Sequence, residues 1–300
     1  MLMAGQVCIA YAGEDALAFW ETDPLRETGR MDIAAMAGMK GLGPRRLAWD
    51  PLYKRLYVSC SFANCVGVVD MENREWLMTV FVGSAPTDVC VCGDRVLVCC
   101  CESESLWALD REDPSAVGCV RLPGFPYSMD NSNHTLLLCC ITRPAVWSVD
   151  KDLAIAGVLE LACAPMHATK LPGGDMLVTL LPGNGFDAGR LVRLDRKGRV
   201  VYALEMGEMP GVVRLSEDNG LAAAVNMEES ELFLVDPDTF SHRKRRVCAM
   251  PDDVLFLPNG AGILATCMID NRAVHLDMKG KPVQCATAGK EPRGMVCLDA

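Results

Sequence analysis

Histidine is scarce in this sequence, with only four residues, and no two cysteines are separated by two residues. The missing Cys-x-x-Cys spacing removes the usual zinc knuckle and the haem attachment motif. No glycine-rich loop of the phosphate-binding kind is present either. These absences leave the sequence without any motif that assigns a catalytic, metal or nucleotide site, so we expect no resident cofactor.

The sequence also lacks an excess of positive charge and any long apolar run. Its net charge is −10 and its isoelectric point is about 5.0, whereas a nucleic-acid binder normally has a basic face. No stretch reaches the length of a membrane span. The first twenty residues show no basic segment followed by an apolar one, as a signal peptide would. We therefore predict a cytoplasmic protein that binds neither nucleic acid nor membranes.

A repeat of about forty residues runs through the chain. Its two markers are a proline after a small or apolar residue and an aspartate that closes an apolar run. They share one period and the same insertion in the fifth unit. The prolines are Pro44, Pro86, Pro126, Pro165, Pro210, Pro251 and Pro292, and the aspartates are Asp70, Asp110, Asp150, Asp195, Asp236 and Asp277.

Each unit contains four short runs rich in valine, leucine and aromatic residues, bounded by turn residues. In the unit from Pro44 they are RLAW, RLYVSC, VGVVD and MTVFVG. Such runs indicate strands, and the marker aspartate is expected to cap the third turn. Four strands per unit at this period predict an all-β fold, a seven-bladed β-propeller with four antiparallel strands per blade.

The two ends of the chain together supply the remaining blade. The sequence ends on a first strand with no successor, and it begins with a second and third strand that lack a predecessor. We predict that the C-terminal strand pairs with the N-terminal blade and closes the ring, leaving no free edge. The chain is then one domain over 1–300, with blade 1 built from 293–300 and 6–43, and blades 2–7 starting near 44, 86, 126, 165, 210 and 251. Region 22–43 is longer than a strand needs, so we expect an irregular or partly helical insertion there.

The repeat resembles the YVTN-type β-propeller repeat at Arg55–Cys60, Val66–Asp70 and Val80–Pro86. That repeat occurs in surface-layer propellers, in lactonase-like proteins and in related quinoprotein subunits. The resemblance covers essentially the whole chain and implies the fold. It implies little about activity, because this fold carries enzymes, binding proteins and scaffolds.

The sequence is rich in cysteine, with 16 residues, three of them in a row at Cys99–Cys101. The repeat places Cys60, Cys100, Cys140 and Cys267 at one position, the end of the second strand. Alternation along a strand turns Cys99 and Cys101 away from Cys100, so the triplet cannot act as one cluster. We interpret these thiols as reduced and packed, because cytoplasmic cysteines seldom form disulfides. A metal site or a nucleophilic cysteine is the less favoured alternative.

The residues that follow the marker prolines form the candidate site, since first strands line the channel of a propeller. Fold maintenance alone favours small or neutral residues there. The polar ones are instead predicted to bind a ligand at the channel rim, with the arginines suited to an anion, or to pair as a salt-bridge belt between blades. They are Arg45, Arg46, Asp88, Tyr127, His167, Asp252, Asp253 and Arg293.

Three other segments suggest contacts. The loops after the second strands hold carboxylates and amides that could bind a divalent cation, although no motif indicates one. The insertion Leu180–Gly189 is a candidate contact loop at the same rim. The basic stretch Ser241–Val247 lies on an outer strand, where it either blocks sheet-to-sheet aggregation or docks an acidic partner.

Two functions are favoured over a redox or metal-handling role, which only the cysteine count supports. The first is a non-catalytic propeller that binds a protein or a small polar or anionic ligand at the channel mouth, or serves as a scaffold. The alternative is a lactonase-like hydrolase that uses rim carboxylates and His167, with or without a divalent cation.

Overall fold

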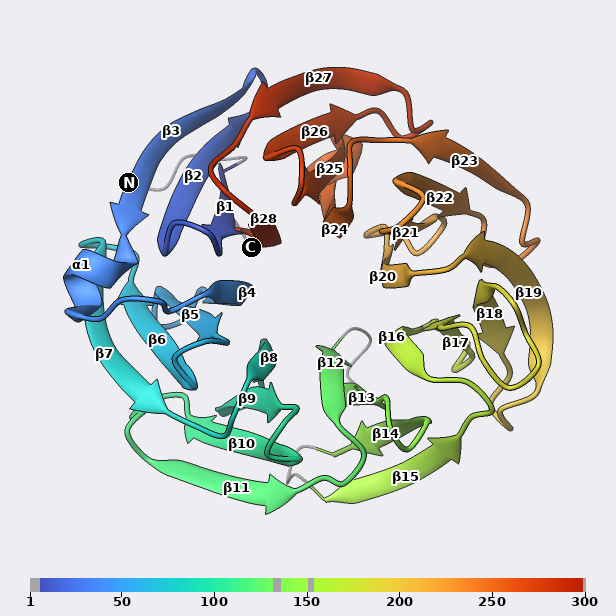
Figure 1. The fold of residues 1–300 in the computed structure, drawn as a ribbon, viewed down its shortest axis with the longest axis horizontal. Helices are drawn as coiled ribbons and strands as arrows, with labels where there is room; N and C mark the ends of the chain where they lie inside the picture. The colour runs from blue at the N-terminus through green and yellow to red at the C-terminus, as the bar shows by residue number, and fades with distance from the viewer. Residues whose placement is uncertain (1–5, 132–135, 151–153, 299–300) are drawn as a thin grey trace. The chain divides into compact units, whose positions relative to one another are not determined.

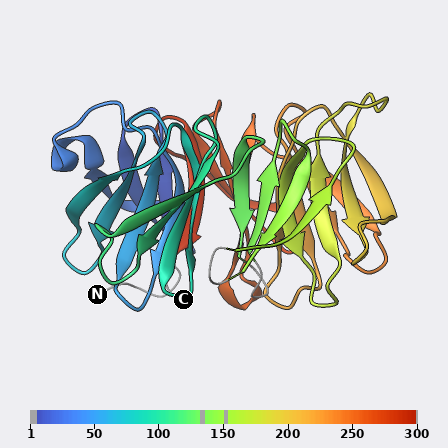
Figure 2. The same ribbon diagram turned by 90° about the horizontal axis from the view of Figure 1, so that it is seen from below.

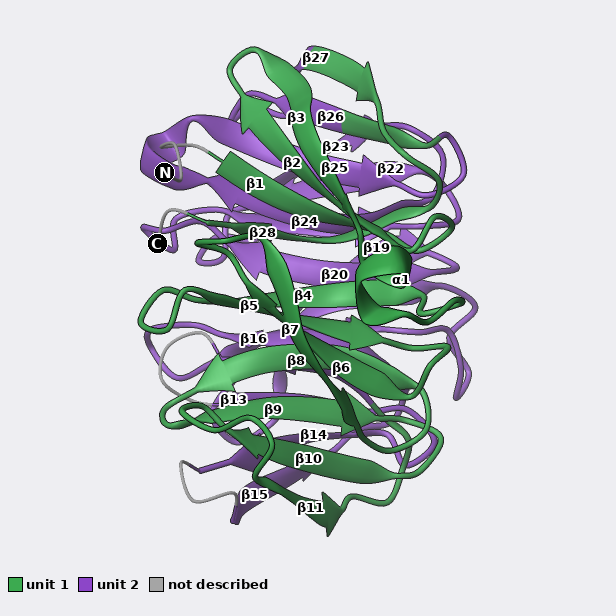
Figure 3. Ribbon diagram, turned by 90° about the vertical axis from the view of Figure 1, so that its left-hand side faces the viewer, with its two compact units in different colours: residues 1–126, 271–273, 284–300 green, residues 127–270, 274–283 purple. Residues whose placement is uncertain are grey.

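The computed structural model describes residues 6–131, 136–150 and 154–298, and nearly all of its regular structure is β-strand. The fold is a seven-bladed β-propeller whose seven sheets each contain four antiparallel strands (Figure 1). Two compact units divide the chain (Figure 3). Unit 1 comprises 1–126, 271–273 and 284–300, and unit 2 comprises 127–270 and 274–283.

Three of the sheets lie in unit 1, and the first joins both ends of the chain. It runs in the order β28 (Pro292–Cys297), β1 (Gln6–Tyr11), β2 (Ala16–Thr22) and β3 (Leu25–Asp32). The second contains β4 (Pro44–Asp50), β5 (Arg55–Cys60), β6 (Cys65–Asp70) and β7 (Glu75–Phe81). The third contains β8 (Pro86–Cys92), β9 (Arg95–Cys100), β10 (Ser105–Asp110) and β11 (Val117–Arg121).

The other four sheets follow the chain in simple order. The fourth sheet contains β12 (Pro126–Asp130), β13 (Leu136–Cys140), β14 (Ala145–Val149) and β15 (Ile155–Glu160), and the fifth contains β16 (Pro165–Lys170), β17 (Met176–Leu180), β18 (Gly189–Leu194) and β19 (Val200–Gly207). The sixth contains β20 (Pro210–Leu215), β21 (Ala222–Asn226), β22 (Glu231–Val235) and β23 (His242–Arg246). The seventh contains β24 (Pro251–Leu257), β25 (Gly262–Cys267), β26 (Arg272–Leu276) and β27 (Pro282–Thr287).

Every first strand begins at a marker proline, and every second strand ends at the repeat position shared by the cysteines. Second strands such as β5 and β9 are buried except at their first residue, while the fourth strand β15 contains only exposed and half-buried residues. Figure 2 shows the strands of each sheet running in alternating directions, so that hairpin turns gather at both strand ends. The predicted four-strand blades are therefore confirmed.

The segment 22–43 contains β3 and the short helix α1 (Ile33–Ala37), which confirms the predicted partly helical insertion. The carboxylate of Asp32 caps the helix by accepting from the amide of Ala35, and Gly38 ends it in the left-handed conformation, with φ of 65°. Glycine reaches this conformation without the steric cost that a Cβ adds. Within the described residues, no helix has the length and apolar character that a membrane crossing requires.

Candidate functional site

The marker aspartates are turn caps. Asp236, for example, accepts hydrogen bonds at Oδ1 from the amides of Asp238 and Thr239, both at 2.9 Å. The same pattern recurs at Asp70, Asp110, Asp195 and Asp277. The amides that donate to Asp236 lower the pKa of its carboxyl group, because they stabilise the ionised form. These residues therefore cap the third turns, as the sequence predicts.

The predicted rim residues divide between the two units. Arg45, Arg46, Asp88 and Arg293 are half-buried in unit 1. Their strands β28 and β8 both contact β4, and a Cβ at Gly294 would lie 2.6 Å from the Arg45 carbonyl oxygen. Unit 1 therefore brings these four residues onto neighbouring first strands.

The rim residues of unit 2 are more deeply enclosed. His167, Asp252 and Asp253 are buried, with exposed fractions of 4%, 4% and 2%, and Tyr127 is half-buried. Asp253 Oδ1 lies 3.6 Å from the guanidinium of Arg214 on the adjacent β20. Sequence reasoning missed Arg214 because it considered only the two residues after each proline, whereas Arg214 is the fourth residue after Pro210.

The carboxylates and amides of the loops after the second strands connect one blade to the next. Asp15 accepts from the amides of Gly41 and Gly43, and Asn64 accepts from the amide of Ala85. Glu104 and Asn271 accept from backbone amides in the same way, whereas Glu229 and Asp270 accept from amides that precede the first strand of their own blade. These side chains, which were suggested as cation ligands, are thus engaged by backbone amides. Over the described ranges, no group of three histidine, cysteine or acidic side chains could hold a metal ion.

The insertion Leu180–Gly189 forms a small turn of its own. Gly183 and Phe186 exchange backbone hydrogen bonds of 3.0 Å, and the guanidinium carbon of Arg190 lies 3.4 Å from the centroid of the Phe186 ring. The predicted contact loop therefore presents the exposed Phe186 ring, with the guanidinium of Arg190 stacked against it.

The thiols of the cysteine triplet are packed as expected, with one difference. Cys99 and Cys100 end β9, whereas Cys101 already belongs to the following turn and donates to the carbonyl oxygen of Ala85. Burial raises the pKa of Cys100 to about 12 and that of Cys99 well above its ordinary value. Neither thiol is a ready nucleophile, because nucleophilic attack requires the thiolate.

Cys248 and Cys267 depart from the fully reduced expectation. The structure joins them in a disulfide, with their Cα atoms 5.7 Å apart. The bridge connects the end of β25 to the loop that precedes β24. Repeat analysis could not predict it, because Cys248 has no counterpart in the other units.

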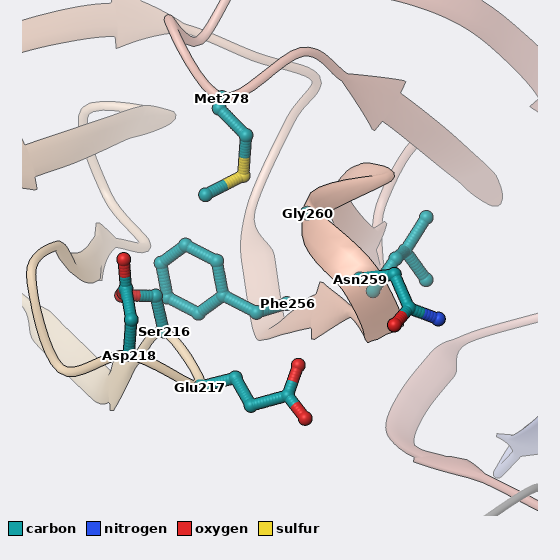
Figure 4. A pocket seen from close by; sticks show the side chains of 8 residues that line it. Ser216, Glu217, Asp218, Phe256, Asn259, Gly260 and Met278 are labelled. Carbon is teal, nitrogen blue, oxygen red and sulfur yellow. The ribbon is translucent and has the colours of Figure 1, made fainter.

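Unit 2 contains a pocket at the strand ends opposite those that hold its predicted rim residues. It occupies about 360 Å³ between the β20–β21 turn, the end of β24 with the following η2 (Pro258–Gly260), and the β26–β27 turn (Figure 4). It is lined by Ser216, Glu217, Asp218, Phe256, Leu257, Asn259, Gly260 and Met278. Figure 4 shows the Phe256 ring between Met278 and the acidic turn.

The two carboxylates of this pocket differ in their freedom. Asp218 Oδ1 accepts from the hydroxyl of Ser216 at 2.6 Å and from the amide of Gly220 at 3.0 Å. The Ser216 hydroxyl, followed by the Gly220 amide, lowers the pKa of Asp218. Glu217 is exposed, and no hydrogen bond or ion pair holds its carboxylate among the described residues. One negative charge is therefore fixed and the other can turn toward a ligand.

Sequence reasoning missed this pocket because its residues lie in three turns that look ordinary. The signal that could have located the pocket is the register of the repeat. The turns LSEDNG and LPNGAG follow the first strands of consecutive units, so they must be neighbours.

The comparisons with known proteins support the fold and no finer conclusion. No protein-family model and no curated protein matches the sequence, so the resemblance to the YVTN repeat remains a hypothesis. A crystal structure of a protein from Lactobacillus plantarum is similar, with a TM-score of 0.75 at 14% identity over 98% of this chain and 99% of that one. Virginiamycin B lyase from Staphylococcus aureus gives 0.72 at 12% identity over 86% and 89%.

A third similar structure is the Cps50 (Swd1) β-propeller domain of Myceliophteria thermophila. Its TM-score is 0.66 at 14% identity, over 84% of this chain and 88% of that domain. At such identities the likeness shows the propeller fold alone, and these neighbours differ in function.

Proposed function

We propose that this protein is a binding propeller whose unit 2 pocket receives a cationic group with an apolar body, such as a lysine or arginine side chain of a partner protein. The observation that carries the proposal is the pocket itself, where the exposed Glu217 carboxylate stands beside the Phe256 ring and Met278. An aromatic face attracts a cation, and a carboxylate completes the charge pairing.

The chemistry of the lining favours this class of ligand over an anion. Glu217 and Asp218 are both acidic, and the low pKa of Asp218 keeps it charged below the ordinary range of an aspartate. Phe256, Leu257 and Met278 supply an apolar surface for the methylene stem that leads to an ammonium or guanidinium group.

The rim takes a structural part in this proposal. Asp253 pairs with Arg214 of the neighbouring blade, which supports a role in holding blades together over binding of a small polar or anionic ligand at the channel mouth. The lactonase-like alternative is not favoured either. His167 and Asp253 would have to reach a substrate from positions that are only 4% and 2% exposed.

Calorimetry with capped arginine and lysine amides, and with neutral capped glutamine amide, tests the proposal. The two cations should bind and the neutral compound should not. Glu217→Gln and Phe256→Leu should each weaken binding by about fivefold. Glu228→Gln, which removes an exposed carboxylate at the other strand ends, serves as the matched control and should bind normally. Equal binding of all three compounds, or unchanged affinity in Glu217→Gln, would refute the assignment.

The single domain over 1–300 and the cytoplasmic location remain parts of this proposal. A partner protein with an exposed basic side chain is the class of partner that it implies.

A further inference from the structure

The outer strand β23 is the most strongly charged element of the molecule. Its five residues, His242, Arg243, Lys244, Arg245 and Arg246, are all exposed. The protein as a whole carries a net charge of −10, so this strand is a local reversal of charge. Other outer strands differ. β11 presents Val117 and Val120, and β19 presents Val200, Val201 and Tyr202.

Few of these charges are neutralised within the protein. Lys244 pairs with Glu231 at 2.9 Å. Arg243 donates to the carbonyl oxygen of Met278 and Arg245 to that of Lys244, at 3.0 and 3.1 Å. Across the described part of the chain, no carboxylate forms an ion pair with Arg243, Arg245 or Arg246. Charged side chains commonly protect an edge strand from pairing, but three guanidinium groups without carboxylate partners give β23 a denser positive charge than the apolar outer strands β11 and β19.

The backbone of β23 also has an unpaired edge. The strand is last in its sheet and, among the strands that the structure describes, pairs with β22 alone. Backbone hydrogen bonds from Asp236 to Ser241 and from Val247 to Ser230 fix which residues face β22. The register is continuous, so Arg243 and Arg245 also face β22, while the N–H and C=O groups of Lys244 point outward. The contact of Arg245 with the Lys244 carbonyl oxygen shows that a donor can reach this edge.

We propose that β23 is a docking strand for an extended acidic segment of a partner protein, which adds to the sheet as a fifth strand. The outward groups of Lys244 would supply main-chain hydrogen bonds, and Arg243 and Arg245, which share one face of the strand, would pair with carboxylates on alternate residues of the segment. A peptide is favoured over nucleic acid because a strand edge recognises a backbone with amides, and because the net negative charge of the protein repels a long polyanion.

The experiment measures fluorescence anisotropy of a short labelled peptide that alternates glutamate and threonine. The peptide should bind, and a version with proline at alternate positions should not, because proline cannot join a strand ladder. Arg243→Gln/Arg245→Gln should bind about tenfold more weakly. Arg196→Gln/Lys197→Gln, which removes the same charge from the exposed β18–β19 turn, is the matched control and should bind normally.

A second pair of variants separates the backbone edge from its charge. Lys244→Pro and Lys244→Ala both lose the ammonium group, but only Lys244→Pro loses the outward N–H. Binding should therefore fall further in Lys244→Pro, with thermal midpoints measured to confirm that both variants fold. Equal binding by the two would overturn strand addition. Failure of the wild-type protein to bind the peptide, or equally tight binding of a single-stranded oligonucleotide, would overturn the proposal. Glu217→Gln should leave peptide binding unchanged, so the test of the docking strand can fail or succeed independently of the test of the pocket.

Discussion

Single side chains tie one blade to the next, and Asp50 is the clearest case in unit 1. Its carboxylate is completely buried at the end of β4. Both oxygens accept from Arg111 of the next blade at 2.5 Å, and Oδ1 also accepts from the amides of Leu52 and Tyr53. In unit 2, Arg193 has a comparable part, because its guanidinium pairs with Asp175 of its own blade at 2.9 Å and donates to the carbonyl oxygen of Pro237 in the next blade at 2.6 Å.

Replacing Asp50 by alanine should destabilise the protein, because it leaves the guanidinium of Arg111 without its carboxylate. Removing one partner of such a pair costs about 3 kcal/mol of unfolding free energy. Urea denaturation measures this loss. The control is Lys54→Ala, which breaks an exposed ion pair with Glu72 and should leave the midpoint unchanged. Similar midpoints for the two variants would contradict the importance of Asp50.

The contribution of Asp50 should also depend on pH. Burial opposes ionisation, but the hydrogen bonds and charge of Arg111, with the two amides, hold the pKa of Asp50 below its ordinary value. The stabilisation is therefore complete above the unfolded pKa of about 3.9 and is lost as the pH falls through the lower folded pKa. The difference in unfolding free energy between wild type and Asp50→Ala should be constant near neutral pH and shrink below about pH 4. A difference that stays constant into strong acid would show that the charge of Asp50 is not responsible.

Individual strands are held by close packing that depends on small residues. On β6, Gly67 lies directly beneath the indole of Trp76, and a Cβ at this position would come within 2.0 Å of the ring. Trp76 is itself fixed, because its Nε1 donates to Thr79 Oγ1 at 3.0 Å. A larger residue would have to displace the indole from β7.

Gly67→Ala should lower stability by about 1–3 kcal/mol, the usual cost of overpacking. Gly118→Ala on β11 is the matched control, because a Cβ there meets no atom within 4 Å. Thermal denaturation of both variants should show a lower midpoint for Gly67→Ala only. A tolerated Gly67→Ala would mean that Trp76 is free to move.

The molecule is closed by its last strand. β28 pairs with β1, with Val7 opposite Cys297 and Cys8 opposite Val296. The amide of Leu298 donates to the carbonyl oxygen of Gln6 at 2.9 Å. Residues from the two chain ends thus complete one sheet, and β1 would be a free edge without them.

Deleting residues 292–298 should therefore lower the thermal midpoint by about 10 °C or more and promote aggregation. A circular permutant that joins the chain ends and opens at the exposed turn Gly93–Asp94 is the control, since it keeps every strand. It should fold like the wild type. A stable, monomeric deletion variant would show that β28 is dispensable for closure.

Much of the fold could be predicted from the sequence, because the repeat makes the same local signals recur seven times. The prolines gave the start of each first strand and the aspartates gave the third turns. The candidate site was less predictable. Register identified the first-strand residues, but it could not show that Asp253 faces Arg214 or that Asp15 and Asn64 are engaged by neighbouring backbone amides.

By itself, the sequence determined the blades, their order and the closure by β28, since alternation and turn chemistry act over a few residues and repeat along the chain. Only the tertiary structure decided which polar groups are satisfied and which face an opening, because contacts between blades join residues far apart in the sequence. Glu217 and Asp253 are both acidic residues near the first strand of a blade. Packing leaves one exposed beside Phe256 and buries the other near Arg214.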